Sequence, residues 1–350
     1  MSPSRLEENG DASKQRVVCL GAPKFAGDEY LDAFSQQFDY EVLEASTRAE
    51  TQEKLPKLIE RGGPVDAFII RMGTPPYEPF DEDLLKALAP KCRIITSASA
   101  GYNEFDVEWM SRNGIIFCNS VDAVAEATAD MAMFLTLAVL RNAFTAASVA
   151  KAGNWRGKPG QLSPARDPTG LTLGIVGMGA IGKYLATKAA AFNMKIAYHN
   201  RHQLPNEEEA TYNAAYCSSL KELLSTADVV SLNCPLNANT TNLISTDEFA
   251  AMKDGTFLIN TARGAIVDEA AFKVALQSGK VARAGLDVLC NEPNVDPWFF
   301  EQENVIVQPH LGGLTDVAFQ KAERECFENI KAFFETGKAN SPVNLDKIKK

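Results

Sequence analysis

The sequence predicts an α/β protein with two doubly wound parallel-sheet domains. Three observations support this expectation. Short apolar, β-branched runs alternate with longer helical or loop segments, as a parallel sheet requires. The 350 residues, of which 45% are hydrophobic, suffice for two separate cores. A glycine-rich turn between an apolar run and an Ala-rich segment marks the start of a second series of strands.

The first domain is expected to open with a strand at residues 17–21 and a helix at about 29–38. Further short apolar strands are expected at 40–43, 67–70, 93–96 and 115–118. One long Ala-rich helical region follows at 123–152, with Asp122 and Glu126 near its start, where the helix dipole favours acidic side chains. The next segment, 153–170, is rich in Gly, Pro and Arg and is too irregular to belong to a core.

A βαβ unit with a glycine motif opens the second domain. An apolar strand at 171–176 leads into Gly177-Met178-Gly179-Ala180-Ile181-Gly182, which a helix at 183–192 and a strand at 194–199 follow. In this setting the glycines permit a tight turn, close approach of backbone to a pyrophosphate, and close helix–strand packing. The helix N-terminus offers free N–H groups to the phosphates. The motif alone would also fit an ordinary turn, but its context predicts a dinucleotide site.

Four further strands are expected in the second domain, at 229–233, 256–260, 284–288 and 305–307. The dinucleotide-binding domain would then comprise residues 123–316. It would be inserted into a discontinuous substrate domain of residues 1–122 and 317–350. The expected architecture is therefore two doubly wound domains of the Rossmann or flavodoxin-like type with a cleft between them.

The end of the second strand of the βαβ unit indicates which dinucleotide is preferred. NAD-binding sites usually place an acidic residue there, which binds the ribose 2′-OH. This chain has Asn200, Arg201 and His202 instead. An acidic residue would repel the 2′-phosphate of NADP, whereas Arg201 would pair with it. We therefore expect NADPH, with some tolerance of NADH; the alternative is that Arg201 is a solvated loop residue.

Composition argues against several classes of partner. The net charge is −10 and basic residues are not clustered, so nucleic acid is not expected. The longest apolar run, 131–140, is far shorter than the roughly 20 residues of a membrane span. The polar N-terminus lacks a signal-peptide core, and the seven cysteines contain no C-x-x-C pair. We expect a cytoplasmic protein with reduced core thiols and no metal site.

Three polar residues follow three successive strands of the second domain, where open α/β sheets bind ligands. They are Arg263, Glu292 and His310. Carbonyl reduction by hydride requires a proton donor and a cation that polarises the C=O, and it benefits from an acid that orients the donor. His310 fits the donor, Arg263 the cation and Glu292 the acid. Taken singly, each also fits a surface ion pair, a structural histidine or a turn.

Several motifs of this chain together resemble the D-isomer-specific 2-hydroxyacid dehydrogenases over nearly its whole length. They are the glycine motif, Ser97-Ala-Ser-Ala-Gly-Tyr-Asn103, Val124-Ala-Glu-Ala-Thr-Ala-Asp130, Asn260-Thr-Ala-Arg-Gly264, Ala284-Gly-Leu-Asp-Val288 with Glu292-Pro293, and Pro309-His310. The segment Tyr198-His-Asn-Arg-His-Gln-Leu-Pro205 further resembles fungal glyoxylate reductases of this family.

The resemblance implies a role for each matching residue. His310 would protonate the carbonyl oxygen, Glu292 would favour the protonated imidazole, and Arg263 would bind the carboxylate and carbonyl of the 2-oxo acid. The backbone at Ala100, Gly101 and Tyr102 would hold the carboxylate from the other domain. The expected cofactor contacts are Gly177, Gly179, Ala180, Ile181, Asn200, Arg201, His202, Cys234, Pro235, Thr240, Thr261, Ala262, Asp287, Thr128, Gly312 and Gly313.

Two departures from the family pattern affect these expectations. Many members carry Arg or Lys where this chain has Ala180, so pyrophosphate binding would depend more on the helix N-terminus. After the histidine the chain reads Leu311-Gly-Gly313, where Gly-Ser-Ala-Thr is frequent, so main-chain contacts to the nicotinamide remain but a serine contact does not. The long helix and the arm after it resemble the family's dimer interface. Trp155 belongs either to that arm or to the ordinary surface.

The resemblance favours reduction of a small 2-oxo acid, glyoxylate or hydroxypyruvate, to the D-2-hydroxy acid. A bulkier acid would require an open pocket, which Arg71 and residues 298–300 could shape, although 298–300 could equally be core. Glu292 argues against a formate dehydrogenase, because those enzymes have Gln at this position. A length of 350 residues leaves no room for the extra domain of the long phosphoglycerate dehydrogenases. The alternative outside enzymes is a dinucleotide-sensing regulator like the family's corepressors.

Overall fold

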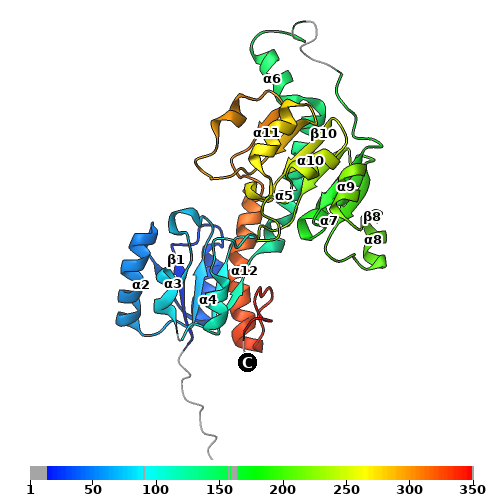
Figure 1. Cartoon of the computed structure of the whole chain (residues 1–350). Helices are drawn as coiled ribbons and strands as arrows, with labels where there is room; N and C mark the ends of the chain where they lie inside the picture. Colours follow the sequence, from blue (N-terminus) through cyan, green and yellow to red (C-terminus); the bar gives the residue numbers. More distant parts are fainter. Residues whose placement is uncertain (1–13, 90, 157, 159–163, 349–350) are drawn as a thin grey trace, which may run out of the picture. The chain divides into compact units, whose positions relative to one another are not determined.

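The computed structural model describes residues 14–89, 91–156, 158 and 164–348 (Figure 1). The chain divides into two compact units. Unit 1 comprises residues 1–123 and 316–350, and unit 2 comprises residues 124–315. These limits differ by one residue from the domain limits that the sequence suggested. Each unit is built on its own parallel sheet.

Unit 1 has a five-stranded parallel sheet in the order β2-β1-β3-β4-β5. Its strands are β1 (Arg16–Leu20), β2 (Asp39–Leu43), β3 (Ala67–Ile70), β4 (Ile94–Ser97) and β5 (Ile116–Cys118). Every residue of β1, β3 and β4 is buried, because helices cover both faces of the sheet. The order is that of a flavodoxin-like doubly wound sheet.

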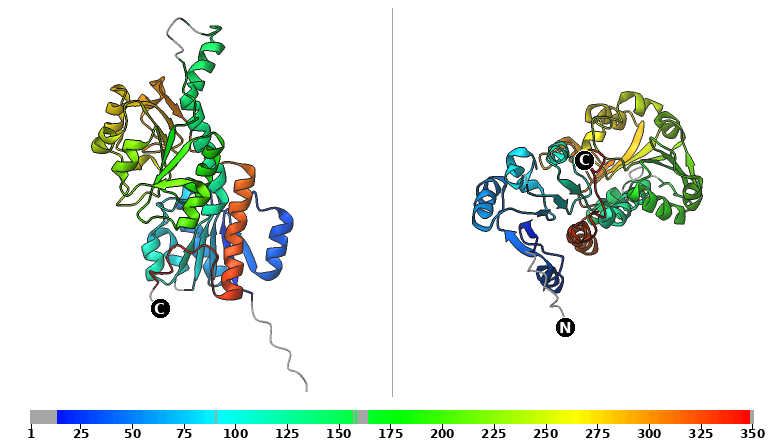
Figure 2. Two further views of the ribbon diagram at one scale, coloured as in Figure 1. Left: turned by 90° about the vertical axis from the view of Figure 1, so that its right-hand side faces the viewer. Right: turned by 90° about the horizontal axis from the view of Figure 1, so that it is seen from below.

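The helices of unit 1 come from both ends of the chain. They are α1 (Asp28–Gln37), α2 (Arg48–Gly62), α3 (Glu82–Leu85), α4 (Val107–Arg112) and α12 (Asp316–Thr336), with short 3₁₀ turns at Pro75–Tyr77 and Lys86–Leu88. Helix α12 packs on β3 and β4 (Figure 2). Its buried Glu323 accepts hydrogen bonds from the N–H groups of Lys24, Phe25 and Ala26. The C-terminal helix is therefore an integral layer of unit 1.

The end of the chain is also fixed to this unit. The side-chain oxygen of Asn344, a fully buried residue, accepts from the N–H of Phe117 in β5 at 2.9 Å, and its amide nitrogen donates to the carbonyl of Ile115. The N–H of Val343 donates to the carbonyl of Phe117. The backbone N–H and C=O of Phe117 in the edge strand β5 thus find their hydrogen-bond partners more than 220 positions further along the chain.

Unit 2 has a seven-stranded parallel sheet in the order β12-β11-β10-β9-β6-β7-β8. Its strands are β6 (Thr172–Val176), β7 (Lys195–His199), β8 (Ala214–Tyr216), β9 (Val229–Leu232), β10 (Thr256–Asn260), β11 (Val281–Leu286) and β12 (Val305–Val307). The chain order reverses between β6 and β9, where a Rossmann-type sheet forms its ligand crevice. The fold class predicted from the sequence is confirmed.

Helices cover both faces of this second sheet. The helices of unit 2 are α5 (Val121–Arg141), which begins in unit 1, α6 (Ala143–Lys151), α7 (Ala180–Ala191), α8 (Asn206–Tyr212), α9 (Leu220–Thr226), α10 (Thr246–Ala251) and α11 (Glu269–Gln277). One apolar cluster joins α5 and α7 to the sheet, and a separate one joins α9, α10 and α11 to it. Short 3₁₀ turns occupy Gly264–Ile266 and Pro297–Glu301.

Three local expectations differ from the structure. The helical region 123–152 is two helices, because Asn142 adopts a left-handed conformation with φ 48° and separates α5 from α6. Strand β8 was not expected. Strand β11 occupies 281–286 rather than 284–288, because its pairing with β10 begins earlier, at Val281.

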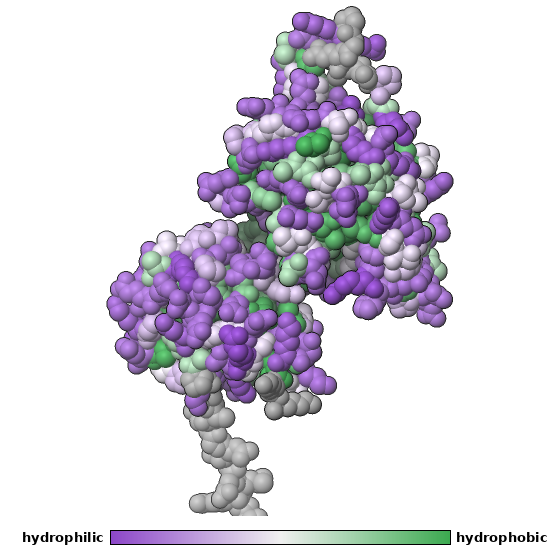
Figure 3. Space-filling view, viewed as in Figure 1, coloured by the Kyte–Doolittle hydropathy of each residue, from purple (hydrophilic) through white to green (hydrophobic). Residues whose placement is uncertain are grey.

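Helix α5 meets the length and hydropathy criterion for a membrane span, and it is the only helix of the described residues to do so. However, 67% of its most apolar window is buried inside the protein. Its Ala129, Leu135 and Val139 are fully buried in the core of unit 2. A core helix of a soluble domain meets the same criterion. On the face seen in Figure 3, hydrophilic residues predominate on the surface of both units.

Candidate active site and family

The glycine turn after β6 has the shape that a bound phosphate requires. Gly177 has φ 100°, and a Cβ there would lie 2.8 Å from the backbone nitrogen of Cys234. A Cβ on Gly182 would lie 2.5 Å from the carbonyl oxygen of Gly177, whereas one on Gly179 would meet no protein atom within 4 Å. No side chain caps the N-terminus of α7, which begins at Ala180. Its first N–H groups are therefore available to an anion.

The loop directly after β7 begins with Asn200, Arg201 and His202. The side-chain oxygen of Asn200 accepts from the N–H of Met178 at 2.7 Å, so this residue holds the glycine turn. Arg201 and His202 are exposed. The preceding His199 directs Nδ1 to the carbonyl of Cys217 at 2.9 Å. A neutral amide at position 200 and a cation at 201 leave this strand end without a negative charge of its own.

Two orphaned polar atoms lie at the ends of β9 and β10. The side-chain oxygen of Asn233 and the hydroxyl of Thr261 are buried and lack a hydrogen-bond partner among the described residues. Asn233 follows β9, at the switch point, and Thr261 follows the neighbouring strand β10, so a ligand in the crevice would satisfy them. Sequence reasoning selected Thr261 but missed Asn233. Its polar side chain directly after the apolar strand β9 was the signal that could have found it.

The other expected cofactor residues of unit 2 lie in loops and on α5. Thr240 donates its hydroxyl to the carbonyl of Pro235 at 2.6 Å, and Cys234 is partly buried. The Thr128 hydroxyl donates to the carbonyl of Val124 within α5. A Cβ on Gly313 would lie 3.3 Å from the side chain of Val124, so the segment after His310 packs directly on α5. These residues, with the glycine turn and the orphaned atoms, fit a dinucleotide.

Arg263 is presented by a constrained loop after β10. Asn260 donates its side-chain amide to the carbonyl of Arg263 at 2.9 Å, and the guanidinium donates to the carbonyl of Ala262 at 2.8 Å. The next residue, Gly264, is in such close contact with Leu289 that a Cβ would lie 2.0 Å from the carbonyl carbon of Leu289. The Arg263 loop therefore packs on the segment that carries Glu292.

Glu292 and His310 form a pair. Oε2 of Glu292 lies 2.8 Å from Nδ1 of His310, and Oε1 accepts from the N–H of Leu289 at 2.9 Å. Burial acts to raise the pKa of Glu292, but the bonds from His310 and Leu289 and the nearby Arg263 outweigh it, so the pKa is lowered. The carboxylate is thus charged at neutral pH. Because it occupies Nδ1, the nitrogen left for a substrate is Nε2.

Asp287 holds the turn after His310. Its two carboxylate oxygens accept from the N–H groups of Leu311 and Gly312, each at 2.8 Å, and its carbonyl accepts from the N–H of His310. His310 itself adopts φ 57°, a left-handed conformation that these bonds maintain. Burial raises the pKa of Asp287, and the two N–H bonds oppose this effect.

The expected substrate residues of unit 1 are Ala100, Gly101 and Tyr102, for the carboxylate, and Arg71, for the shape of the pocket. Asn119 donates to the carbonyl of Ala100 at 2.6 Å, and Ser99 donates to that of Gly101. Within the described chain, the N–H groups of residues 100–102 have no acceptor, as an anion-binding loop would require. Arg71 donates to the carbonyl of Met72, and its buried Nε has no partner among the described residues. Unit 1 thus has its own set of free donors.

Other side chains considered in the sequence lie elsewhere. Phe299 is fully buried in the core of unit 2, Trp298 packs against that core, and Phe300 is exposed. Trp155 is 85% exposed. No group of three or more His, Cys, Asp or Glu side chains in the described residues could hold a metal ion.

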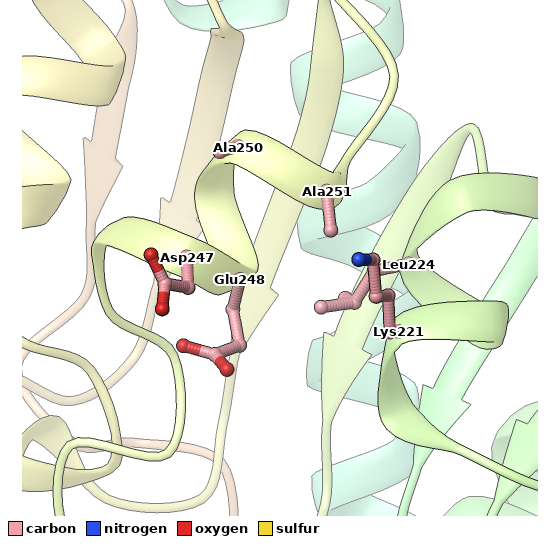
Figure 4. Close-up of a pocket in the computed structure, with 6 residues that line it drawn as sticks. All are labelled: Lys221, Leu224, Asp247, Glu248, Ala250 and Ala251. Atoms are coloured by element: carbon pink, nitrogen blue, oxygen red, sulfur yellow. The ribbon is translucent and has the colours of Figure 1, made fainter.

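A pocket of about 460 Å³ lies between α9 and α10 (Figure 4). Its lining comprises Lys221, Leu224, Asp247, Glu248, Ala250 and Ala251. Glu248 is already used in the capping box of α10, where it accepts from the N–H of Ser245 at 3.1 Å. None of the site residues described above lines this pocket.

The family comparison agrees with the geometry. The profile of the D-isomer-specific 2-hydroxyacid dehydrogenase NAD-binding domain matches residues 133–312. A dehydrogenase, efuE, of Hormonema carpetanum is 56% identical over 98% of this chain and 84% of its own length. The chain belongs to the D-isomer-specific 2-hydroxyacid dehydrogenase family. It is therefore an oxidoreductase with a nicotinamide dinucleotide as cofactor.

Two further relatives differ in the substrate that they reduce. The crystal structure of a glyoxylate reductase from Paecilomyes thermophila has a TM-score of 0.86 and 37% identity, covering 94% of this chain and 98% of that one. The 4-methyl-2-oxopentanoate reductase A of Aspergillus oryzae is 44% identical over 74% of this chain and 77% of its own. Similarity to relatives therefore supports 2-oxo acid reduction but leaves the size of the acid open.

Proposed function

We propose that the protein reduces a small 2-oxo acid, glyoxylate or hydroxypyruvate, to the D-2-hydroxy acid with NADPH in the cytoplasm. The Glu292–His310 pair at 2.8 Å is the observation that carries this proposal. It joins a carboxylate and an imidazole at the strand ends of a dinucleotide-binding sheet, as proton donation to a carbonyl requires.

The cofactor, when bound, supplies the hydride that reduces the carbonyl carbon. His310 would donate a proton from Nε2 to the carbonyl oxygen, and the negative charge of Glu292 would stabilise the imidazolium beforehand. Arg263 would bind the substrate carboxylate and oppose the negative charge that develops on the carbonyl oxygen. The free N–H groups of Ala100, Gly101 and Tyr102 would bind the carboxylate as well. NADPH is proposed because Arg201 stands where an acidic residue would select NADH.

A bulkier 2-oxo acid is the second candidate, favoured by the 44% identity to the 4-methyl-2-oxopentanoate reductase. Apolar pocket walls discriminate by only about 1–3 kcal/mol per methylene. A few side chains could therefore change the preferred acid without altering the residues that carry the chemistry.

Initial rates of NADPH and NADH oxidation with glyoxylate, hydroxypyruvate, pyruvate and 4-methyl-2-oxopentanoate test the proposal. We expect turnover with NADPH and the two small acids, and a loss of about 100-fold or more in kcat for His310→Ala with unchanged NADPH binding. Turnover with the branched acid alone would overturn the substrate. Tight NADPH binding without any turnover would favour a dinucleotide-sensing regulator.

A further inference from the structure

The loop after β7, residues 200–204, is held at both ends. At its start, the carbonyl of Asn200 accepts a hydrogen bond from the hydroxyl of Tyr216 at 3.3 Å. The side-chain oxygen of Asn200 accepts from the N–H of Met178 in the glycine turn. At its end, the N–H of Leu204 donates to the hydroxyl of Tyr198 at 2.9 Å. Between these anchors the loop presents Arg201 and His202 to solvent. Hydrogen bonds therefore fix both ends of the loop, while Arg201 and His202 between them are exposed.

The end of this loop is held by the buried hydroxyl of Tyr198 and the carboxylate of Glu209. Tyr198 is fully buried in β7 and donates its hydroxyl to Oε1 of Glu209 in α8. Glu209 also accepts from the side-chain amide of Gln203 at 3.1 Å. Burial, and then the bond to Glu209, raises the pKa of Tyr198 to about 12, so the hydroxyl retains its proton at neutral pH. One tyrosine thus connects the strand, the loop and α8.

Helix α8 brings three consecutive carboxylates close to this loop in sequence, at Glu207, Glu208 and Glu209. Carboxylates near a 2′-phosphate would repel it. Glu208 is paired with Lys183 of α7, and Glu209 is engaged by Tyr198 and Gln203. Glu207 is exposed. Glu208 is therefore paired with a cation, whereas Glu209 keeps its charge and is held in place by neutral donors. Arg201 and His202 stay exposed in the loop.

We propose that Tyr198 and Glu209 are positioning residues that determine the preference for the 2′-phosphorylated dinucleotide, by fixing the loop from which Arg201 and His202 bind the phosphate. This inference rests on the proposed use of NADPH. A held loop binds an anion more tightly than a mobile one, because less conformational freedom is lost on binding. The effect should be largest at the 2′-phosphate, since Tyr198 and Glu209 bond to residues 203 and 204 of the loop that carries Arg201 and His202.

Binding of two fragments isolates this effect. Adenosine 2′,5′-bisphosphate and adenosine 5′-monophosphate differ only in the 2′-phosphate, and their affinities are measured by isothermal titration calorimetry at low salt. We expect the wild type to prefer the bisphosphate. Tyr198→Phe and Glu209→Ala should weaken the bisphosphate by about fivefold or more while changing the monophosphate by less than about twofold. In turnover, KM for NADPH should rise at constant kcat.

Two variants separate positioning from charge. Glu209→Gln keeps an acceptor for the Tyr198 hydroxyl and should retain the wild-type preference. Glu207→Gln removes the same charge from an exposed position and should behave likewise. Tyr198→Phe keeps the buried ring, and thermal unfolding checks that each variant is folded.

The outcomes distinguish this inference from the proposed function. A wild type that binds both fragments equally would overturn the use of NADPH and this inference with it. A wild type that prefers the bisphosphate, with variants that weaken both fragments equally or neither, would overturn the positioning role and leave the use of NADPH standing. Loss of preference in Glu209→Gln would also contradict the positioning role.

Discussion

At the scale of single residues, the site depends on hydrogen bonds that fix otherwise unfavourable states. His310 adopts a left-handed conformation because Asp287 binds the N–H groups of the two residues that follow and accepts from the histidine N–H itself. Glu292 is in turn oriented by the N–H of Leu289. The imidazole is therefore held from the backbone side and from the Nδ1 side, and its freedom is restricted before any substrate arrives.

The charge of Glu292 leads to a pH-dependent prediction. Its pKa is lowered in the folded state, so its interactions stabilise the protein fully above the unfolded-state value of about 4.3 and are lost as the pH falls through the lower folded value. Glu292→Gln should lower Tm at pH 7, and the difference from wild type should shrink as the pH approaches about 4. Thermal unfolding across this range measures it. A difference that grows in acid would contradict the assignment.

The sequence suggested candidate site residues more readily than the hydrogen bonds that position them. Arg263, Glu292 and His310 could be proposed because parallel strands end at one edge of a sheet and because the motifs around these residues resemble the family. The bonds from Asp287 to backbone N–H groups, and from Asn200 to Met178, could not, because they join segments 22 to 25 residues apart. A residue's type shows which groups it can bind, but only the fold determines which it reaches.

At the scale of elements, the β6–turn–α7 unit was predictable because its pattern is local. A strand run, three spaced glycines and an Ala-rich helix all lie within about twenty residues, and the fold adds only that α7 begins at Ala180. The break between α5 and α6 was not predictable, because Ala-rich sequence continues on both sides of Asn142. Strand β8 was missed because Ala214–Tyr216 is short and weakly apolar, and pairing with β7 defines it.

Two of the three glycines of the β6–turn–α7 unit, Gly179 and Gly182, should separate cofactor binding from stability. Gly179→Ala places a methyl group in space that no protein atom occupies, so Tm should stay within about 2 °C while NADPH binding weakens about tenfold. Gly182→Ala directs its methyl group at the carbonyl of Gly177 and should lower both Tm and affinity. Fluorescence titration with NADPH and thermal unfolding measure these effects. Undiminished binding in Gly179→Ala would place the pyrophosphate elsewhere.

At the scale of the whole molecule, α5 and α6 each carry an exposed aromatic side chain. Phe134 and Phe144 are 47% and 43% exposed, and their ring centroids lie 6.2 Å apart. Neighbouring exposed apolar side chains are a feature that protein–protein contacts use. We propose a homodimer that uses this face. Sequence alone suggested it only through the family resemblance, because exposure is a property of the fold.

Sedimentation velocity tests the dimer. The wild type should sediment as a dimer, and Phe144→Asp should shift the population toward monomer, because a charge would be buried in an apolar interface. Phe192→Asp, on another exposed aromatic residue that is 40% accessible, is the matched control and should remain dimeric. A monomeric wild type would contradict the proposal.

The discontinuity of unit 1 has a consequence for how the chain folds during synthesis. Residues 124–315 form an uninterrupted unit that can complete its sheet while the ribosome is still adding the remainder. The N-terminal part of unit 1 cannot do so before α12 and Asn344 are made, because α12 covers β3 and β4 and Asn344 accepts a hydrogen bond from β5. We therefore expect the apolar strands β3 and β4 to stay incompletely covered until this later part of the chain has been made. A premature stop near residue 315 would therefore spare the unit that binds the cofactor and leave the N-terminal strands prone to aggregation.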